Sequence, residues 1–182
     1  MPVVDSVIGL GWLVFWIYWL AASFGVKAGQ ARWTRFAGIR VAVILVILLL
    51  LRLRIFKRNE VTHDPWLQVV GLVIFVLGLG LAVWARIYLG RNWGMPMSQK
   101  ADPELVTTGP YSKVRHPIYS GIILAMIGTT IAVSLYWLAA VVLVGAYFSY
   151  SAVTEERYMA ERFPDTYPKY QQSTKMLIPF VL

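Results

Sequence analysis

The chain has 182 residues, of which 58% are hydrophobic, and its mean hydropathy is +0.62. It contains no cysteine and only two histidines, so disulfides, thiolate metal sites and a cysteine nucleophile are excluded, and no metal site is expected. The net charge is +8, but the Lys and Arg residues lie between apolar blocks, where the positive-inside rule places them. We therefore expect membrane lipids, and no nucleic acid, as partners.

The apolar residues are gathered in blocks that are long enough to cross a bilayer. No charged residue occurs in residues 7–24, 66–85 or 117–154, and a membrane-spanning helix needs roughly 20 mostly apolar residues. The sequence therefore predicts an all-α integral membrane protein. Because Asp5 is the only charge before Lys27, the first block lacks the basic start of a signal peptide, and we interpret it as a retained helix.

About five membrane-spanning helices are expected. The first three cover about 7–24, 38–51 and 65–89. The last apolar block is too long for one crossing at 1.5 Å per residue and is interrupted by polar residues near its middle. It therefore predicts a C-terminal helical hairpin of about 118–132 and 135–153.

Two polar segments and the distribution of Lys and Arg predict the orientation. Residues 90–115 read as a polar loop, and residues 155–175 as an interfacial helix followed by a turn. With five crossings, 13 of the 17 Lys and Arg residues fall on one side of the membrane. The positive-inside rule then predicts an N-terminus outside, a C-terminus in the cytoplasm, and a cytoplasmic loop and interfacial helix.

The segment Arg115-His116-Pro117 is the first candidate for chemistry. Pro117 suits the first turn of a helix because its missing N–H would have no partner there. His116 is then expected at the N-cap of the fourth helix, where the helix dipole favours an anion. Arg115 adds a fixed positive charge and a bidentate donor. A basic cluster that contacts lipid headgroups is the alternative interpretation.

Glu155 and Glu156, expected at the end of the fifth helix, are the second candidate. Carboxylates are unfavourable at a helix C-terminus, which suggests that they compensate a cation or bind a ligand; simple solvation is the alternative. The hairpin returns this pair to the face that carries Arg115 and His116. The sequence therefore predicts one polar site at one membrane face.

A third candidate is Gly78-Leu79-Gly80 in the third helix. Small residues in a spanning helix are most often packing residues. A GxG without a strand, turn and helix around it is not a dinucleotide-binding fingerprint.

Several motifs together resemble the isoprenylcysteine carboxyl methyltransferase family, with which phospholipid N-methyltransferases share a core pattern. They are Trp84 to Trp93, Leu105 to Tyr111, Arg115 to Gly121, the Glu155-Glu156 pair, and Phe163 to Pro179. The resemblance covers about residues 70–180. It implies an S-adenosylmethionine-dependent enzyme, with residues 1–65 supporting the fold or acceptor access and residues 66–182 forming the methyltransferase core.

The resemblance also implies roles for individual residues. His116, Tyr119, Gly121, Glu155 and Glu156 would bind the cofactor, with Tyr111 closing the site. Gly78 and Gly80 are added because the phospholipid branch uses a GxG in a spanning helix. Arg86, Arg115 and Glu156 are the expected catalytic residues.

The acceptor is the open part of this interpretation. The family default is a prenylcysteine-like carboxylate, and a lipid amine is the alternative; either is a lipophilic small molecule or a lipidated acceptor. By this resemblance, two arginines of the prenylcysteine enzymes that would suit an acceptor carboxylate are replaced here by Ala82 and Ser151. Arg86 lies one helical turn from Ala82 on the same helix face and is the candidate substitute. An NADPH-dependent sterol-reductase-like enzyme is an alternative of another class, and a membrane scaffold without catalysis is a third.

Overall fold

The computed structural model describes residues 2–24, 29–30, 64–94, 99–100 and 104–178. Its helices are α1 (Pro2–Ser23), α3 (Pro65–Leu89), α4 (Pro117–Ala132), α5 (Trp137–Arg162) and α6 (Tyr167–Ser173). Two short 3₁₀ turns, η2 (Gly90–Asn92) and η3 (Gly109–Ser112), and one antiparallel pair of two-residue strands, β1 (Gly29–Gln30) and β2 (Gln99–Lys100), complete the described elements. The second expected helix, 38–51, lies outside the described residues.

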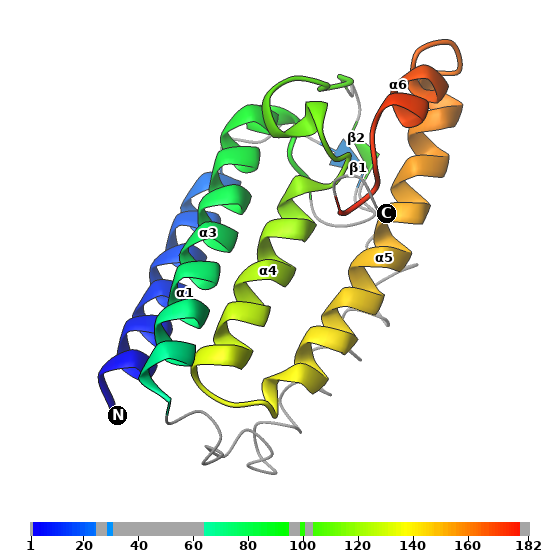
Figure 1. Ribbon diagram of the computed structural model, residues 1–182. Coiled ribbons are helices and arrows are strands. Elements are labelled where there is room, and N and C mark those ends of the chain that lie inside the picture. The colour runs from blue at the N-terminus through cyan, green and yellow to red at the C-terminus, as the bar shows by residue number, and fades with distance from the viewer. Residues whose placement is uncertain (1, 25–28, 31–63, 95–98, 101–103, 179–182) are drawn as a thin grey trace.

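The described helices confirm the all-α integral membrane fold. Three of them are long and apolar enough to cross a membrane, over Val3–Ser23, Pro65–Asn92 and Leu135–Arg162, and α4 is a shorter apolar helix. α1, α3 and α5 run in one direction and α4 runs in the other, which gives the expected α4–α5 hairpin (Figure 1). Large hydrophobic side chains such as Leu10, Ile17 and Val76 are exposed on the flanks, as a lipid-facing surface requires.

The start and end of α3 follow from local chemistry. The Asp64 carboxylate accepts a hydrogen bond from the backbone N–H of Trp66 at 2.9 Å, and Pro65 occupies the first turn. At the other end Gly90 has a φ of +51°, a conformation that glycine adopts without a steric penalty. The N–H of Gly90 donates to the carbonyl of Arg86.

α3 and α4 pack closely because small residues face each other. A Cβ atom at Gly78 would lie 2.7 Å from the carbonyl oxygen of Gly121, and one at Gly121 would lie 2.7 Å from the carbonyl oxygen of Gly78. Gly71 and Gly128 form a second contact of the same kind. Backbones that approach this closely gain packing energy, which substitutes for the hydrophobic effect between helices in lipid.

α1 packs on this pair of helices. The indole N–H of Trp12 donates to the hydroxyl of Thr129 in α4 at 3.1 Å, and Ile8 and Phe15 are buried. The division of the chain near residue 65 into a supporting part and a core stays a prediction.

One expected boundary is wrong. α5 continues to Arg162, so residues 155–162 extend the spanning helix and do not begin a separate interfacial helix; the short α6 follows them. The Glu, Arg, Met and Ala residues of this segment are strong helix formers, so the helix continues past the end of the apolar block at residue 154. Glu155 and Glu156 therefore lie before the last turns of α5 and not at its end.

The C-terminal tail lies beside the segment that precedes α4. The backbone N–H of Arg115 donates to the carbonyl of Lys175 at 2.8 Å, and that of His116 donates to the carbonyl of Met176 at 3.1 Å. The Ser120 hydroxyl donates to the carbonyl of Leu177 at 2.5 Å. The tail thus fixes the first turn of α4, and its Leu177 is buried in the core.

Candidate functional site

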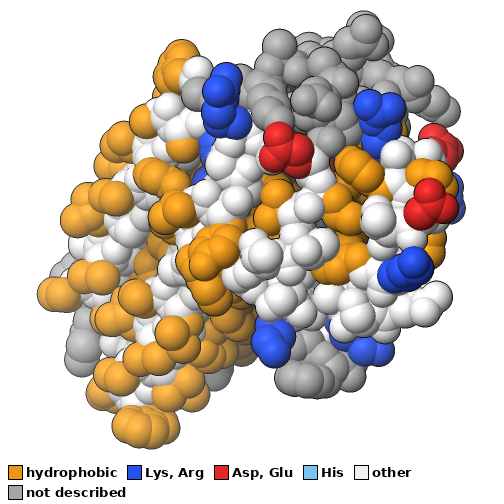
Figure 2. All heavy atoms as spheres, turned by 90° about the horizontal axis from the view of Figure 1, so that it is seen from above, with side chains coloured by type: hydrophobic (Ala, Val, Ile, Leu, Met, Phe, Trp, Pro, Cys, Tyr) orange, Lys and Arg blue, Asp and Glu red, His pale blue; other side chains and the backbone are white. Residues whose placement is uncertain are grey.

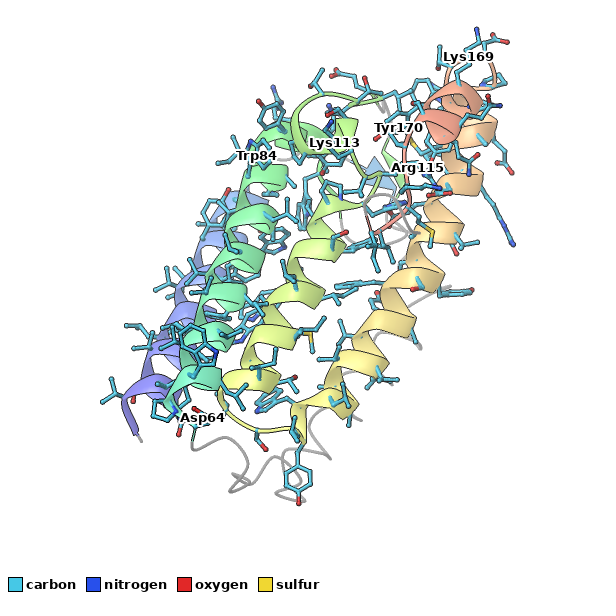
Figure 3. All side chains as sticks on the ribbon, in the orientation of Figure 1. Asp64, Trp84, Lys113, Arg115, Lys169 and Tyr170 are labelled. Carbon is cyan, nitrogen blue, oxygen red and sulfur yellow. The ribbon has the colours of Figure 1, made fainter. Side chains whose placement is uncertain are left out.

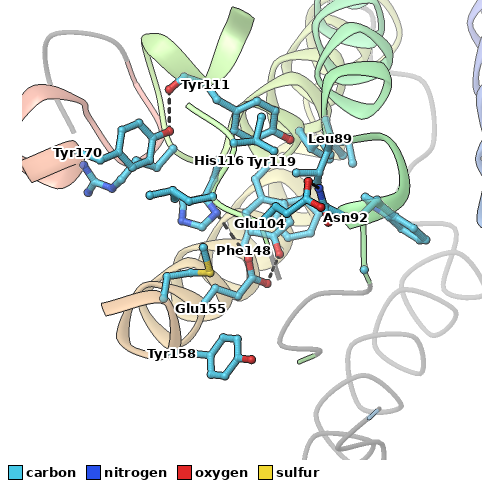
Figure 4. A pocket seen from close by; sticks show the side chains of 18 of the residues that line it. Leu89, Asn92, Glu104, Tyr111, His116, Tyr119, Phe148, Glu155, Tyr158 and Tyr170 are labelled. Atoms are coloured by element: carbon cyan, nitrogen blue, oxygen red, sulfur yellow. Dashed lines mark hydrogen bonds and ion pairs between the residues drawn. The ribbon is translucent and has the colours of Figure 1, made fainter. Parts of the chain in front are cut away.

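The end of the bundle at which α3 and α5 end and α4 begins, at the top of Figure 1, contains a cavity of about 420 Å³. This volume is within the size range of small-molecule sites. Its walls come from α1, the end of α3, the loop before α4, the start of α4, the upper part of α5 and α6 (Figure 4). Its lining residues are Trp16, Trp19, Leu89, Asn92, Trp93, Gly94, Glu104, Leu105, Val106, Tyr111, Arg115, His116, Ile118, Tyr119, Ile122, Phe148, Glu155, Tyr158, Met159, Tyr167 and Tyr170.

His116 and the glutamate pair lie together at this end. His116 occupies the N-cap position of α4 with Pro117 behind it in the first turn, and its side chain makes no capping hydrogen bond. Its Nδ1 is 3.6 Å from Oε2 of Glu155, and its Nε2 is 3.3 Å from Oε1 of Glu156. Nε2 is buried and faces the Glu156 carboxylate without forming a hydrogen bond among the described residues.

A stack of aromatic rings orients the hydroxyl of Tyr119 toward Glu155. The rings of Tyr119 and Phe148 are stacked with centroids 4.4 Å apart, and the rings of His116 and Tyr119 are stacked with centroids 5.4 Å apart. The Tyr119 hydroxyl donates to Oε1 of Glu155 at 2.6 Å. The stack fixes the direction of this hydrogen bond and orients the carboxylate within the cavity wall.

Arg115 ties three segments together. Its Nε and Nη2 donate to the two carboxylate oxygens of Glu156 at 2.6 and 3.3 Å. Its Nη1 donates to the carbonyls of Gln171 and Thr174 at 3.1 and 2.5 Å. Both charged side chains are about nine-tenths buried. The guanidinium is therefore committed to the protein and holds α5, α6 and the start of α4 in place.

Two tyrosines form the wall next to α6. The Tyr170 hydroxyl donates to the backbone carbonyl of Tyr111 at 2.6 Å. Burial raises the pKa of Tyr111, and burial together with the charge of Glu156 raises the pKa of Tyr170 to about 12 against the opposing effect of Arg115. Both phenols therefore stay protonated at neutral pH, and the Tyr170 hydroxyl acts as a hydrogen-bond donor.

The expected glycines do not line the cavity. Gly78 and Gly121 lie in the contact between α3 and α4, where their backbones touch. Gly80 is exposed, and a Cβ atom there would meet no heavy atom within 4 Å. Gly78 and Gly121 thus contribute to helix packing.

Arg86 also lies behind the cavity wall and not on it. Its Nη1 donates to the carbonyl of Gly90 at 2.7 Å, and its Nη2 donates to the carbonyl of Ala22 at 2.6 Å. Ala82 and Ser151, where the resemblance to the prenylcysteine enzymes would place arginines, are both fully buried.

The apolar wall was not expected from the sequence. It includes Trp16 and Trp19 of α1, Trp93 after α3, and Phe148 of α5. The three-residue spacing of Trp16 and Trp19 places them on one face of a helix. The same spacing is typical of lipid-facing aromatic residues, so it does not by itself indicate a cavity.

Charged side chains gather at the end of the bundle that holds the cavity. Figure 3 places Lys113, Arg115 and Lys169 at this end and Asp64 at the other. Seen from above, charged side chains surround the hydrophobic centre of this end, whereas the flank is covered by hydrophobic side chains (Figure 2). This distribution fits a polar membrane face.

The fold and the site together define a helical membrane protein with a small-molecule cavity at one end of its bundle. Residues 66–166 match the model of the family described as phospholipid methyltransferase. Because the match covers more than half of the chain, the protein belongs to this family.

Similar proteins include enzymes named for methyl transfer. Protein-S-isoprenylcysteine O-methyltransferase B of Arabidopsis thaliana is 31% identical over 120 residues, which are 64% of this chain and 61% of the relative. Protein-S-isoprenylcysteine O-methyltransferase of Xenopus laevis is 30% identical over 126 residues, 67% of this chain and 44% of the relative. Nickel-cobalt-cadmium resistance protein NccN of Alcaligenes xylosoxydans xylosoxydans is 27% identical over 143 residues, 77% of this chain and 64% of the relative. The chain thus spans less than two thirds of the length of each of these relatives.

Proposed function

We propose that the protein is an S-adenosylmethionine-dependent membrane methyltransferase that acts on a lipophilic acceptor. Family membership and the names of the isoprenylcysteine relatives support this reaction class. The observation that carries the proposal is a single cavity with a polar wall of His116, Tyr119 and Glu155 and an apolar wall that includes Trp19 and Phe148. A polar methyl donor and a lipophilic acceptor need such walls side by side.

The polar wall offers hydrogen-bonding partners for the amine and hydroxyl groups of S-adenosylmethionine. His116 lines the cavity and holds its imidazole beside the carboxylate of Glu155, with Nδ1 3.6 Å from Oε2. The Glu155 side chain is 26% exposed and offers a carboxylate to amine or hydroxyl groups. When bound, the cofactor supplies an electrophilic methyl group on a positively charged sulfonium. Aromatic faces and a carboxylate both favour a cation of this kind.

The chain contributes orientation and a dry site. Arg115 and Glu156 hold the helices that carry His116 and Glu155, so we assign them a positioning role rather than direct contact with the reacting atoms. Methyl transfer to a carboxylate needs no general base, so proximity, alignment and the exclusion of water supply most of the rate. Burial of Tyr111, Phe148 and Trp93 supports water exclusion.

A prenylcysteine-like carboxylate remains the first acceptor to test, and a lipid amine is the second. Among the described residues that line the cavity, Arg115 is the only Lys or Arg, and Glu156 and two carbonyls occupy its guanidinium. An acceptor carboxylate would therefore find no uncommitted Lys or Arg among these lining residues. An amine needs no cationic partner, and for this reason we keep it as the second acceptor. Radiolabelled methyl transfer into membrane extracts separates the two, since a methyl ester is hydrolysed by base and an N-methyl group is not.

We further propose that the cavity faces the cytoplasm, with the N-terminus on the opposite side. The Lys and Arg residues at the cavity end, among them Lys113, Arg157, Lys169 and Lys175, support this orientation through the positive-inside rule. Labelling of single cysteines introduced at Asp64 and at Lys169 tests it in sealed cells. A membrane-impermeant reagent should label the first and not the second, and the reverse pattern would overturn the orientation.

Binding of S-adenosylhomocysteine to the purified protein tests the function. Calorimetry in detergent should detect binding by the unsubstituted chain, and His116→Ala and Glu155→Gln should reduce the affinity at least about tenfold, since each removes one charged or buried polar partner. Binding of NADPH without binding of S-adenosylhomocysteine would overturn the proposal in favour of a reductase.

A further inference from the structure

Arg86 occupies a junction between three parts of the molecule. It lies in the last turn of α3 and is 5% exposed. Its two hydrogen bonds reach the carbonyl of Ala22 at the end of α1 and the carbonyl of Gly90 at the end of α3. Its guanidinium carbon lies 4.8 Å from the ring centroid of Trp93. One buried cation therefore contacts α1, α3 and a residue of the cavity wall.

A guanidinium is a costly choice at such a position. Burying a charge in an apolar region is unfavourable unless its partners compensate it, and the Nε of Arg86 is buried without a hydrogen-bond partner among the described residues. An aliphatic side chain would fill the same space without the free-energy cost of removing a charge from water. The compensation comes from two helix C-termini, where a cation is favoured, and from the face of the Trp93 indole. The arrangement therefore depends on the charge and the planar shape of the guanidinium, and not on packing alone.

The junction continues into the cavity wall. Trp93 is 8% exposed and lines the cavity. Its ring meets that of Trp19 edge to face, at a centroid distance of 5.6 Å and an interplanar angle of 88°. Trp19 lines the cavity as well and packs on Phe15 within α1 at 5.0 Å. Arg86 thus fixes two indoles of the apolar wall from behind.

The Arg86 end of this wall lies away from the polar wall, and the two walls meet where Phe148 stacks on Tyr119. Figure 4 places Leu89, the last residue of α3, and Asn92 of the η2 turn that follows on the side of the cavity opposite Tyr170. The polar contacts of Glu155 run to Tyr119 and His116 of α4. None of the contacts described for Arg86 reaches this group of residues.

We infer that Arg86 is a positioning residue for the acceptor, which acts by holding the Trp93–Trp19 wall and the end of α1 against the cavity. The inference rests on the proposed methyltransferase function. It replaces the expectation that Arg86 meets an acceptor carboxylate directly. It also assigns α1, which lies outside the residues 66–166 matched by the family model, a part in acceptor binding.

Kinetics and cofactor binding together test the inference. Arg86→Met keeps the length of the side chain and removes its charge and donors, Trp93→Phe keeps an aromatic face, and Trp93→Leu does not. The exposed Arg91 allows Arg91→Met as the matched control. Two acceptor probes are offered in detergent micelles: N-acetyl-S-farnesylcysteine, which carries a carboxylate, and dioleoylphosphatidylethanolamine, which carries an amine. The kinetics of the variants are measured with the probe that the unsubstituted protein methylates.

Arg86→Met and Trp93→Leu should each raise the KM for the methylated probe about tenfold, as expected for the loss of a desolvated cation–π contact. The kcat and the Kd for S-adenosylhomocysteine should stay within about twofold. Trp93→Phe should retain most of the affinity for the probe. The double variant Arg86→Met/Trp93→Leu should be no worse than Trp93→Leu, because the two residues act as one unit.

A distance measurement provides a readout that does not depend on activity. The chain has no cysteine, so nitroxide labels on Ala21→Cys in α1 and Ile87→Cys in α3, both exposed, report only the α1–α3 distance. Arg86→Met should broaden this distance distribution, and Arg91→Met should leave it unchanged.

Three results would overturn the inference: an unchanged probe KM in Arg86→Met, an equal loss of probe and S-adenosylhomocysteine affinity, or an unchanged label distance. Failure of the unsubstituted protein to bind S-adenosylhomocysteine would instead overturn the proposed function on which the inference rests.

Discussion

Gly78 and Gly80 offer a comparison in which one substitution should have opposite effects two residues apart. At Gly78 an added Cβ would meet backbone atoms of α4, including the carbonyl oxygen of Gly121 at 2.7 Å. Backbone cannot rotate away, so α3 and α4 must separate for Gly78→Ala to fit. At Gly80 the added Cβ meets nothing within 4 Å.

The magnitudes follow from packing and helix propensity. Overpacking of this kind destabilises by about 1–3 kcal/mol, whereas Ala in place of Gly at an open helix position stabilises by up to ~1 kcal/mol. For a chain of this size each kcal/mol changes the melting temperature by roughly 2–4 °C. Gly78→Ala should therefore melt roughly 2–12 °C lower and Gly80→Ala up to roughly 4 °C higher than the unsubstituted protein.

Thermal unfolding in detergent, followed by circular dichroism and by S-adenosylhomocysteine binding, measures both effects. Gly80→Ala should bind S-adenosylhomocysteine with unchanged affinity, because Gly80 lies outside the cavity. Equal shifts for the two variants would refute the packing argument, and a loss of affinity in Gly80→Ala would return the GxG motif to the cofactor site.

Three further substitutions test other parts of the structure. Glu156→Ala leaves Arg115 buried without its carboxylate and should cost about 3–5 kcal/mol, which thermal unfolding would detect; the exposed Glu161→Ala is the control and should have no effect beyond about 0.5 kcal/mol. Tyr119→Phe keeps the aromatic stack but removes a 2.6 Å hydrogen bond, so calorimetry should show S-adenosylhomocysteine affinity reduced about tenfold, and unchanged affinity would exclude this hydrogen bond from the site. Gly109→Ala forces a side chain into a backbone with a φ of +58° and should lower stability by about 1–2 kcal/mol; a melting temperature equal to that of the unsubstituted protein would contradict the left-handed turn.

Hydropathy and helix signals were sufficient to predict most of the described fold. The length of the uncharged blocks predicts the spanning helices, and Asp64 with Pro65 predicts the start of α3 to the residue. The hairpin follows from the length of the last apolar block, and it brings Arg115 and His116 to Glu155 and Glu156, as the contacts at 2.6 to 3.6 Å show. Periodicity alone could not set the end of α5, because helix formers continue past the apolar block.

The assignment of side chains within the site was less accessible to the sequence. Arg115 looked like a ligand for an anion, but its guanidinium is used by Glu156 and by carbonyls of α6 and the tail, which are distant in sequence. Arg86 looked like a substitute for a missing arginine, yet its hydrogen bonds reach Ala22, 64 residues away. Such partners are set by tertiary packing, and no local pattern encodes them. The apolar wall was missed for the same reason, since Trp19 reads equally well as a lipid-facing residue.

The central claim is that the cavity wall formed by His116, Tyr119 and Glu155 binds S-adenosylmethionine. Calorimetric titration of the purified protein and of His116→Ala with S-adenosylhomocysteine tests it most directly, with the melting temperature of both as a control for folding. We predict one-site binding by the unsubstituted chain and an affinity at least about tenfold lower in a folded His116→Ala. Absence of binding by the unsubstituted chain, or equal affinity in His116→Ala, would contradict the assignment of this cavity as the methyl-donor site.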